Sequence, residues 1–413
     1  MIYKISSQKL RDDALIDLPA SKSLSNRALI IRGLCGEPCE ISHLSDCDDT
    51  KVMLAAFDFV DKNYSAVDIG AAGTSMRFLT AYFASKEGAQ VVMTGSERMK
   101  QRPISVLVDA LRKLGAEIEY VENEGFPPLR ISGRKLRGGR LEIDGSISSQ
   151  YISALLMIAP TLTCGLDLHL LGDITSVPYI NMTLAMMREF GVAGSFEKNV
   201  ISVKPQQYRA IPYAVESDWS AASYWYEILA LSSEINSIRL KGLRCDSTQG
   251  DCRIANYFEE LGIKTEACEE GVRISRTNTP LPEKVEWNMA SQPDLAQTVI
   301  CTCCALGVSF DITGLHTLRI KETDRIAALE AELLKLGFVV KDSDNDRMFW
   351  VEDKGKGRRE SIATYHDHRM AMAFAPFALV SGGIGIENPE VVSKSYPTFW
   401  NDLEDIGFEI IAE

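Results

Sequence analysis

A unit of about seventy residues recurs along this chain and constrains its fold more than any single motif. One half of the unit is an amphipathic helix that ends in an apolar residue and a glycine. The residues that follow alternate between apolar and polar, as in a β-strand. These glycines are Gly115, Gly191, Gly262, Gly337 and Gly407, at steps of 76, 71, 75 and 70 residues. Glycine suits the position after a helix because it adopts positive φ without strain. A weaker copy without the glycine lies at residues 52–69 and makes six.

The other half of each unit opens with small polar residues and continues as an apolar helix. After the first copy at residues 21–34, its markers are Thr74, Ser148, Ser220, Ser291 and Asp367, at steps of 74, 72, 71 and 76 residues. The two patterns alternate, so each unit should hold two helices plus strands, the first helix buried and the second covering the outside. If two groups of three units face each other, the positive N-terminal ends of six buried helices converge on one cleft.

Composition limits the protein class. At 413 residues the chain is too long for one ordinary core, which predicts two domains or more. A net charge of −13 disfavours a general nucleic-acid binder. No apolar run suits a signal peptide or a membrane span, and the ten cysteines show no disulfide-type spacing, which predicts a cytoplasmic protein. Cys301, Cys303 and Cys304 lie in an apolar segment and are interpreted as buried thiols rather than metal ligands.

The segment LPASKSLSNR, residues 18–27, is the strongest candidate anion site. It places Lys22, Ser23 and Arg27 at the predicted start of a helix, where unpaired N–H groups and the positive dipole end attract phosphate or carboxylate. The alternative is a capped, solvated helix start. That alternative does not explain why Lys22, Arg27, Arg77 and Arg369 all follow predicted helix N-termini.

Three further motifs could hold anions, and each also has a structural interpretation. GAAGTSMR, with Gly73 and Arg77, is a glycine-rich turn into a helix, although neither a Walker loop nor a dinucleotide fingerprint. RMKQRPI contains Arg98, Lys100 and Arg102, with Pro103 predicted as the first residue of the next helix, or is a solvated basic loop. GSISSQ places Ser148, Ser149 and Gln150 at a helix start, where capping alone would also suit them.

Charged motifs near the C-terminus could supply proton chemistry. RIKETDR contains Arg319, Lys321, Glu322, Asp324 and Arg325, which form either a mutually paired network or a carboxylate site tuned by cations. YHDHR offers His366 and His368 two residues apart, which is not helical zinc spacing, so an anion site at Arg369 or simple helix capping is the better interpretation there. VSKSYP adds Lys394 in a loop.

Nine motifs together resemble the 5-enolpyruvylshikimate-3-phosphate synthase family, in order and spacing, from about residue 18 to the end. They are LPASKSLSNRA, GAAGTSMR, RPISVLVDAL, GSISSQYISALLM, SVPYINMTL, SQPD, IKETDR, HDHRMAM and SKSYP. The resemblance implies an α/β fold of two similar domains, each of three βαβαββ units (an inside-out α/β barrel). It places the domains at residues 1–20 with 215–413 and at residues 21–214, with the active site in the cleft between them.

The resemblance also implies a reaction and its participants. The family transfers the enolpyruvyl group of phosphoenolpyruvate to the 5-hydroxyl of shikimate 3-phosphate by addition and elimination, releasing phosphate. It uses no metal and no organic cofactor, and phosphoenolpyruvate-like glyphosate inhibits it. We therefore expect two small-molecule substrates, no nucleic-acid or membrane partner, and a monomer.

Carried over by position, the family's motifs assign roles to sixteen residues. Asp294 corresponds to the proton acceptor and Glu322 to the neighbouring acid or base, and Lys22 is also expected to act in catalysis. The shikimate 3-phosphate ligands are expected to be Lys22, Ser23, Arg27, Ser148, Ser149, Gln150, Ser176, Asp294, Thr317 and Lys321. The phosphoenolpyruvate ligands are expected to be Lys22, Gly73, Arg102, Gln150, Arg325, Arg369 and Lys394.

Two departures from the family pattern stand out. Ala71 replaces a common asparagine in the glycine-rich turn, and Thr317 replaces another asparagine that contacts substrate; neither change removes a charge. Three alternatives remain. The sister enolpyruvyltransferase acting on UDP-N-acetylglucosamine usually has a cysteine before Arg-Pro, where this chain has Met99 and Lys100. The others are an inactive anion-binding scaffold and an RNA terminal phosphate cyclase, which needs a basic surface.

Overall fold

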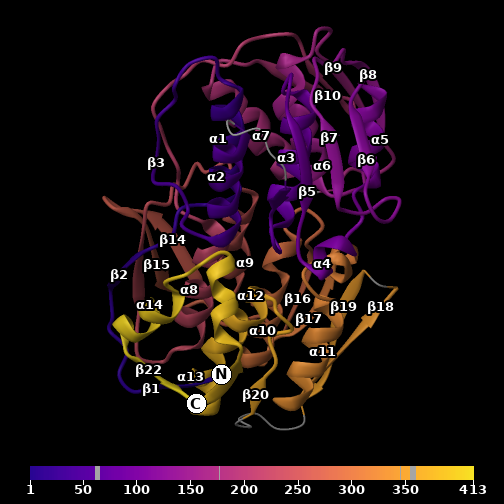
Figure 1. The fold of residues 1–413 in the computed structure, drawn as a ribbon. Coiled ribbons are helices and arrows are strands. Elements are labelled where there is room, and N and C mark those ends of the chain that lie inside the picture. Colours follow the sequence, from indigo (N-terminus) through magenta and orange to yellow (C-terminus); the bar gives the residue numbers. More distant parts are fainter. Residues whose placement is uncertain (61–65, 176, 345, 354–359) are drawn as a thin grey trace. The chain divides into compact units, whose positions relative to one another are not determined.

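The computed structural model describes residues 1–60, 66–175, 177–344, 346–353 and 360–413. The chain forms two compact units (Figure 1). Unit 1 consists of Met1–Ala20 with Glu216–Glu413, and unit 2 consists of Ser21–Val215. The weak repeat copy at residues 52–69 falls partly on residues 61–65, which lie outside the described residues.

Four-stranded sheets of one topology recur in both units. Two strands run parallel, and a hairpin adds its second strand antiparallel to them. In unit 2 these sheets are β4 (Ala66–Asp68), β5 (Gln90–Thr94), β7 (Leu129–Ser132) and β6 (Glu117–Tyr120), then β8 (Gly139–Asp144), β9 (Leu166–Leu171), β11 (Val200–Val203) and β10 (Gly194–Glu197). Among the described residues the third sheet of unit 2 is reduced to a parallel pair, β3 (Ile41–Ser42) and β12 (Tyr213–Ala214).

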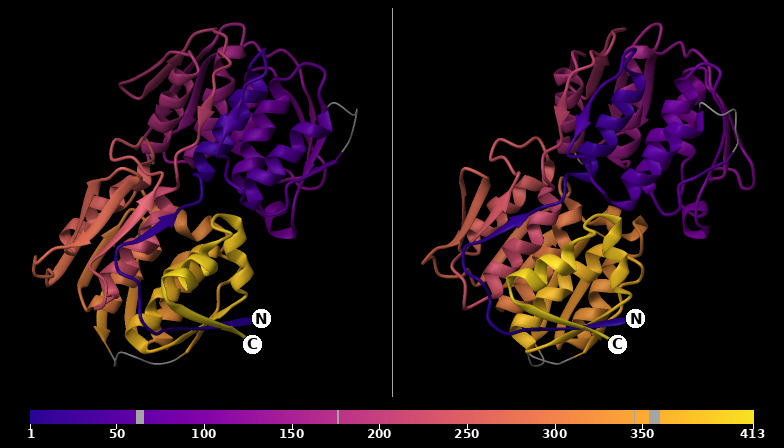
Figure 2. Two further views of the ribbon diagram at one scale, coloured as in Figure 1. Left: turned by 90° about the vertical axis from the view of Figure 1, so that its left-hand side faces the viewer. Right: turned by 60° about the vertical axis from the view of Figure 1, so that its left-hand side comes forward.

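Unit 1 contains two such sheets and a third in which the two terminal strands, β1 and β22, take the place of the hairpin, and the N-terminal segment completes two of the three. The sheets are β2 (Ala14–Asp17), β13 (Ser237–Lys241), β15 (Gly271–Arg276) and β14 (Ile263–Ala267); β16 (Lys284–Asn288), β17 (Ser309–Thr313), β19 (Arg347–Asp353) and β18 (Phe338–Ser343); and β20 (Ser361–Ile362), β21 (Ile384–Glu387), β1 (Ile2–Ser7) and β22 (Phe408–Ala412). Strand β2 runs parallel to β13, and β1 lies between β21 and β22. The two termini are therefore neighbours (Figure 2).

The first helix of each repeat is buried, as predicted. These inner helices are α1 (Lys22–Leu34), α3 (Gly73–Ser85) and α6 (Ser149–Ile158) in unit 2, and α8 (Trp219–Leu231), α10 (Ala296–Leu306) and α12 (His368–Phe374) in unit 1. In α3 every residue from Gly73 to Ala84 is buried. Within each unit the inner helices pack against one another, so their apolar surfaces form the core.

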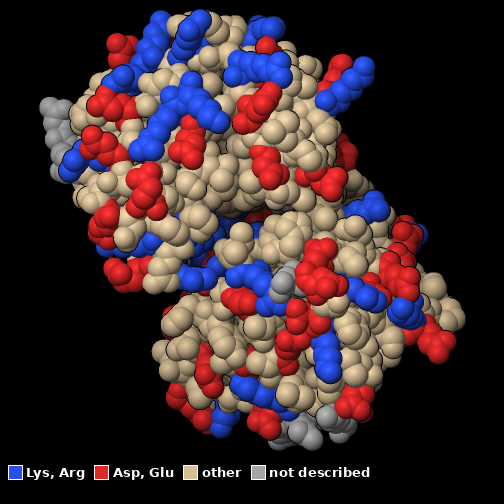
Figure 3. All heavy atoms as spheres, turned by 90° about the vertical axis from the view of Figure 1, so that its right-hand side faces the viewer, with Lys and Arg blue, Asp and Glu red and all other residues tan. Residues whose placement is uncertain are grey.

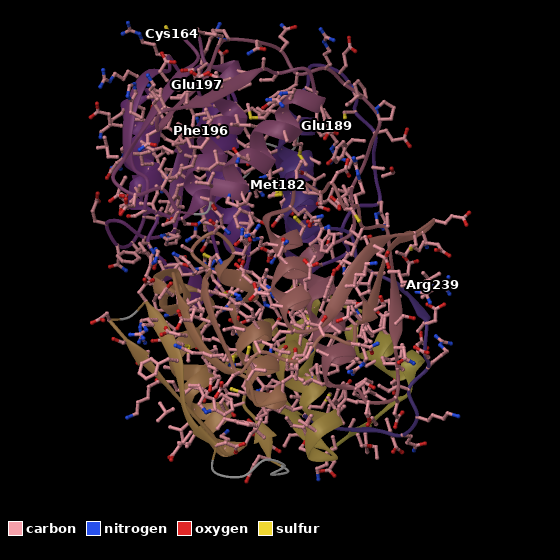
Figure 4. All side chains as sticks on the ribbon, turned by 180° about the vertical axis from the view of Figure 1, so that it is seen from behind. Cys164, Met182, Glu189, Phe196, Glu197 and Arg239 are labelled. Atoms are coloured by element: carbon pink, nitrogen blue, oxygen red, sulfur yellow. The ribbon has the colours of Figure 1, made fainter. Side chains whose placement is uncertain are left out.

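The second helix of each repeat covers its unit from outside. These outer helices are α2 (Asp48–Val60), α5 (Ser105–Lys113), α7 (Val177–Glu189), α9 (Ile254–Glu260), α11 (Arg325–Lys335) and α14 (Phe399–Ile406). Helix α7 illustrates their two faces: Met182 is buried, whereas Glu189 is exposed (Figure 4). Acidic and basic side chains are interspersed over the surface that Figure 3 shows.

Short helices fill the connections between these elements. They are α4 (Glu97–Lys100), α13 (Ala378–Ser381), η1 (Ala159–Thr161), η2 (Gly250–Arg253), η3 (Pro293–Leu295), η4 (His316–Ile320), η5 (Ala375–Phe377) and η6 (Pro389–Lys394). No helix formed by the described residues is both long and apolar enough to cross a membrane.

The glycines that close the outer helices have the predicted conformation. Their φ angles are 106° at Gly115, 82° at Gly191, 81° at Gly262, 97° at Gly337 and 115° at Gly407. L-residues with a side chain rarely adopt these angles, so glycine ends the helix and redirects the chain into the following strand.

The predicted start of α5 is wrong by two residues. Pro103 was expected to be its first residue, but α5 begins at Ser105 with Ile104 as its N-cap. The carbonyl of Pro103 accepts a hydrogen bond from the Tyr151 hydroxyl at 2.6 Å. If Pro103 began the helix, its carbonyl would accept a backbone N–H of the next turn; here the carbonyl accepts from the Tyr151 side chain instead.

Candidate active site

The N-terminus of α1 begins at Lys22, and the Ser21 hydroxyl caps it by accepting from the Leu24 N–H at 3.5 Å. The anchor of this region is Arg27, which is 2% exposed. Its guanidinium donates to the Thr183 hydroxyl at 2.8 Å, the Ser153 hydroxyl at 3.0 Å and the Ser23 carbonyl at 2.9 Å. These bonds tie α1 to α6 and α7 and hold the first turn around Ser23.

Arg27 supplies a buried charge that no carboxylate compensates among the described residues. Burial lowers its pKa to about 10, so it remains a cation at neutral pH. Its hydrogen-bond acceptors are neutral oxygens, and its guanidinium lies 5.2 Å from the centre of the Phe78 ring. A buried cation held by neutral groups raises the positive potential at the N-terminus of α1 and thereby favours an anion there.

The glycine-rich turn lies against two arginines. A Cβ atom at Gly73 would come within 2.6 Å of Arg102 Nη1 and 3.0 Å of Arg77 Nη1, so only glycine leaves room for both guanidinium groups. Arg77 also donates to the Gly73 carbonyl at 2.9 Å. The buried Nε of Arg102 has no hydrogen-bond partner among the described residues, which leaves one donor of this cation available to a ligand.

Helix α6 brings its N-terminus to the same place. Ser148 is its N-cap and accepts from the Gln150 N–H at 3.4 Å, and Ser149 is its buried first residue. The Gln150 amide donates to the Thr74 hydroxyl of α3 at 3.1 Å. The N-termini of α1, α3 and α6 thus form one group within unit 2. Ser176 lies outside the described residues, so its expected place in this group is untested.

Unit 1 contains a cluster of alternating charges, here called the charged cluster. Its members are Asp294, Lys321, Glu322, Arg325, Asp367, Arg369 and Lys394. Arg325 is the centre and is 1% exposed. Its three nitrogens contact Asp294 at 2.9 Å, Glu322 at 2.8 Å and Asp367 at 2.7 Å.

Three further cations border the carboxylates of the charged cluster. Lys394 Nζ lies 2.8 Å from Glu322 Oε1, and Lys321 Nζ lies 3.3 Å from Asp294 Oδ1. Arg369 donates to the Asp294 carbonyl at 3.0 Å and lies 3.4 Å from its Oδ2. Four cations thus face three carboxylates, which leaves a positive excess suited to an anionic ligand.

The ionisation of Asp294 follows from these neighbours. Burial alone would raise its pKa, but Lys321, Arg369 and Arg325 outweigh burial and hold the pKa well below its usual range. The pKa of Arg325 is raised, because Asp367, Glu322 and Asp294 outweigh the effect of its burial. Asp294 is therefore an ionised carboxylate at neutral pH, which makes it a proton acceptor rather than a donor.

The RIKETDR segment forms paired networks, as one of its two interpretations predicted, and the proton-chemistry interpretation stays a prediction. Arg319 donates to Asp324 at 2.8 Å and also pairs with Asp342, which makes a separate structural network. Lys321, Glu322 and Arg325 instead join the charged cluster. Thr317, two residues before Arg319, has a buried hydroxyl without a hydrogen-bond partner among the described residues, as a substrate-contacting group would.

Asp367 is the member of the charged cluster whose role the sequence analysis missed. It is fully buried, caps α12 by accepting from the Arg369 N–H at 2.9 Å, and binds Arg325 through both oxygens. The signal was an aspartate at a predicted N-cap directly before an arginine, but its partner lies 42 residues away. Cys301, Cys303 and Cys304 are buried thiols outside any disulfide, as predicted. No described residues form a group of three or more ligands able to hold a metal ion.

Comparison with known proteins decides the family. The model of the EPSP synthase (3-phosphoshikimate 1-carboxyvinyltransferase) family matches residues 58–403. The chain belongs to the EPSP synthase family. Similar relatives include the 3-phosphoshikimate 1-carboxyvinyltransferases of Bacteroides fragilis strain YCH46, 53% identical over 96% of both chains, and of Mannheimia haemolytica, 37% identical over 96% of this chain and 97% of the relative.

Solved structures agree in fold. An EPSP synthase structure from Acinetobacter baumannii covers 100% of both chains with a TM-score of 0.80 at 21% sequence identity. The predicted α/β class with repeated βαβαββ units, and the predicted EPSP synthase family membership, are therefore confirmed.

Proposed function

We propose that this chain transfers the enolpyruvyl group of phosphoenolpyruvate to the 5-hydroxyl of shikimate 3-phosphate and releases phosphate. Its place in the EPSP synthase family and its likeness to relatives named 3-phosphoshikimate 1-carboxyvinyltransferase support this reaction. The ionised Asp294, held among three cations within the charged cluster, is the observation that carries the proposal. It supplies a base at a site with a positive excess, and the reaction needs a base beside two polyanions.

The proposed division of ligands follows the two groups of residues. The helix N-termini of unit 2 would bind shikimate 3-phosphate through Lys22, Ser23 and Arg27, with the hydroxyl and amide groups of α6 beside them. Arg325, Arg369 and Lys394 of unit 1 would bind phosphoenolpyruvate, together with Arg102 beside Gly73. Lys22 and Gln150 would be shared between the two substrates.

The proton transfers fit the two carboxylates in this proposal. In the addition step, the 5-hydroxyl oxygen bonds to C2 of phosphoenolpyruvate and loses its proton to a base, while C3 gains a proton. In the elimination step, C3 loses a proton and the C2–O bond to phosphate breaks. Asp294, ionised before substrate binds, would take the hydroxyl proton. Glu322, which is paired with Arg325 and Lys394, would be the acid or base that exchanges a proton with C3.

Substrate binding should itself strengthen Asp294 as a base. The cations that depress its pKa are those expected to bind the substrates' negative charges. When phosphate or carboxylate groups engage those cations, their stabilisation of the ionised aspartate weakens and its pKa rises toward the operating pH. The base would therefore be activated only with substrates in place.

Phosphate release tests the proposal directly. Purified protein should release phosphate from phosphoenolpyruvate only when shikimate 3-phosphate is present. UDP-N-acetylglucosamine, the acceptor of the sister enzyme, should not replace it. Release with UDP-N-acetylglucosamine alone would assign the chain to the sister activity, and no release with either acceptor would indicate an inactive scaffold.

We further propose that the enzyme works in the cytoplasm as a monomer. None of the ten cysteines, all among the described residues, forms a disulfide, which is the state that a reducing compartment maintains. Analytical ultracentrifugation at micromolar concentration should give a single species near 45.7 kDa.

A further inference from the structure

Asp251 is a buried carboxylate of unit 1 outside the charged cluster. It lies in η2, far along the chain from that cluster, and is 4% exposed. Its Oδ2 accepts a hydrogen bond from the Ser220 hydroxyl in the first turn of α8. A buried carboxylate is costly without strong partners, so this bond fixes the direction of the Ser220 proton.

The Ser220 oxygen then has its lone pairs available to another donor. Arg369 Nη2 lies 3.5 Å from this oxygen, and the same nitrogen lies 3.4 Å from Asp294 Oδ2. A hydroxyl has one proton and two lone pairs, so committing the proton to Asp251 makes Ser220 an acceptor toward Arg369. Asp251, Ser220 and Arg369 thus form a relay from a buried carboxylate to a guanidinium of the charged cluster.

We propose that Asp251 is a positioning residue for phosphoenolpyruvate binding, acting on Arg369 through the Ser220 hydroxyl. This inference rests on the proposed function, in which Arg369 is a phosphoenolpyruvate ligand. Its specific content is that two residues outside the expected site set the affinity for one substrate and not for the other.

The relay matters most during turnover. When Asp294 accepts the hydroxyl proton, its carboxyl group becomes neutral and its hold on Arg369 weakens. The Asp294 carbonyl still holds Nη1 at 3.0 Å, and the Ser220 hydroxyl, 3.5 Å from Nη2, still contacts the other nitrogen. Because Asp251 is separate from that proton transfer, its bond to Ser220 persists and keeps Nη2 in place.

Steady-state kinetics with variants tests the relay. Ser220→Ala removes the hydroxyl, Ser220→Thr retains it, and Asp251→Asn replaces the charged acceptor with a neutral one of the same shape. The loss of one such hydrogen bond typically costs about three- to tenfold in affinity. We therefore expect Ser220→Ala and Asp251→Asn to raise KM for phosphoenolpyruvate by about that factor. Ser220→Thr should stay near wild type, and the Kd of shikimate 3-phosphate should change less than about twofold.

Two controls separate positioning from general structural damage. Asp246→Asn changes an exposed aspartate five residues earlier, paired with Arg244, and should leave both substrates unaffected. The double variant Asp251→Asn/Ser220→Ala should be no worse than the worse single variant, because both act through one contact. Thermal unfolding of each variant checks that it is folded.

The outcomes distinguish this inference from the proposed function. If wild-type protein releases no phosphate with shikimate 3-phosphate, the proposed function fails. If wild-type protein is active but Asp251→Asn weakens both substrates equally, weakens neither, or adds independently to Ser220→Ala, Asp251 has no positioning role.

Discussion

Replacing Asp294 with asparagine tests the proposed base most directly. Asparagine has nearly the same shape and can still accept a hydrogen bond from Arg325 through its side-chain oxygen, but it cannot take a proton. The charged cluster would then have four cations and two carboxylates, so its positive excess would rise by one charge. Turnover should therefore fall while anion binding is retained or strengthened.

The magnitude follows from the role of a positioned base. Loss of such a group typically costs about 10²–10⁴ in rate, equivalent to about 2.7–5.5 kcal/mol of transition-state stabilisation. Because only the transfer of the hydroxyl proton is affected, kcat should fall by that factor. The Kd values of both substrates should not rise above wild type.

The assay combines phosphate release with equilibrium binding of each substrate. Asp342→Asn is the matched control, because Asp342 also pairs with an arginine, Arg319, but lies outside the charged cluster. The control should keep near-wild-type kcat. Asp294→Asn with kcat within about threefold of wild type, or with kcat and both affinities lost together, would refute the assignment of Asp294 as the base.

Three further predictions follow from single residues. Gly73→Ala should displace Arg102 and raise KM for phosphoenolpyruvate at least about tenfold in kinetic assays, with shikimate 3-phosphate binding unchanged. Gly36→Ala, whose Cβ would meet nothing within 4 Å, is its control, and equal losses for both substrates would contradict the expected role. Lys22→Met should weaken binding of both substrates and turnover together, measured by titration and initial rates; loss of turnover alone would contradict its shared role. Glu227→Gln should flatten the pH dependence of the unfolding free energy measured in urea at pH 5 to 8. Burial raises the pKa of Glu227 well above its usual range in the folded protein. As the pH rises, Glu227 therefore loses its proton in the unfolded chain before it does so in the folded protein. Above the pKa of the unfolded state, the unfolding free energy of the wild type should fall by up to about 1.4 kcal/mol per pH unit. Parallel slopes for Glu227→Gln and wild type would show that Glu227 does not titrate in this way.

Glu227 is a residue whose burial the local sequence pattern did not predict. It lies within the apolar run of α8, and neither carboxyl oxygen has a hydrogen-bond partner among the described residues. The pattern predicted a buried helix, which is correct, because apolar periodicity depends on neighbours within one or two turns. The pattern did not indicate that an ionisable group would be buried with it.

Site residues at helix starts could be predicted for the same local reason. Ser21, Ser148 and Asp367 each cap the helix that follows, because a short polar side chain bonds an N–H group two or three residues ahead. Their capping depends on the chain immediately around them. The sequence therefore indicated where cations and hydroxyls would meet free helix N–H groups.

The partners of those charges could not be predicted, because they come from distant segments. Arg325 binds Glu322 three residues away, but also Asp294 31 residues away and Asp367 42 residues away. Nothing local assigned Arg319 to a structural pair and Arg325 to the charged cluster, although six residues separate them. Only the packing of α10, α11 and α12 decided which carboxylate meets which cation.

The amino-acid sequence by itself determined the repeat, the buried and covering helices, and the glycines that end them. Each of these depends on contacts within a few residues or on a periodic apolar face. Tertiary structure alone decided that β1 and β2 complete sheets with strands more than 200 residues away, and that the third sheet of unit 2 shrinks to two short strands among its described residues. It also decided the ionisation of Asp294, because a pKa depends on the charges that folding brings near, and the three cations beside Asp294 come from two segments distant from it in the sequence, one with Lys321 and Arg325 and one with Arg369.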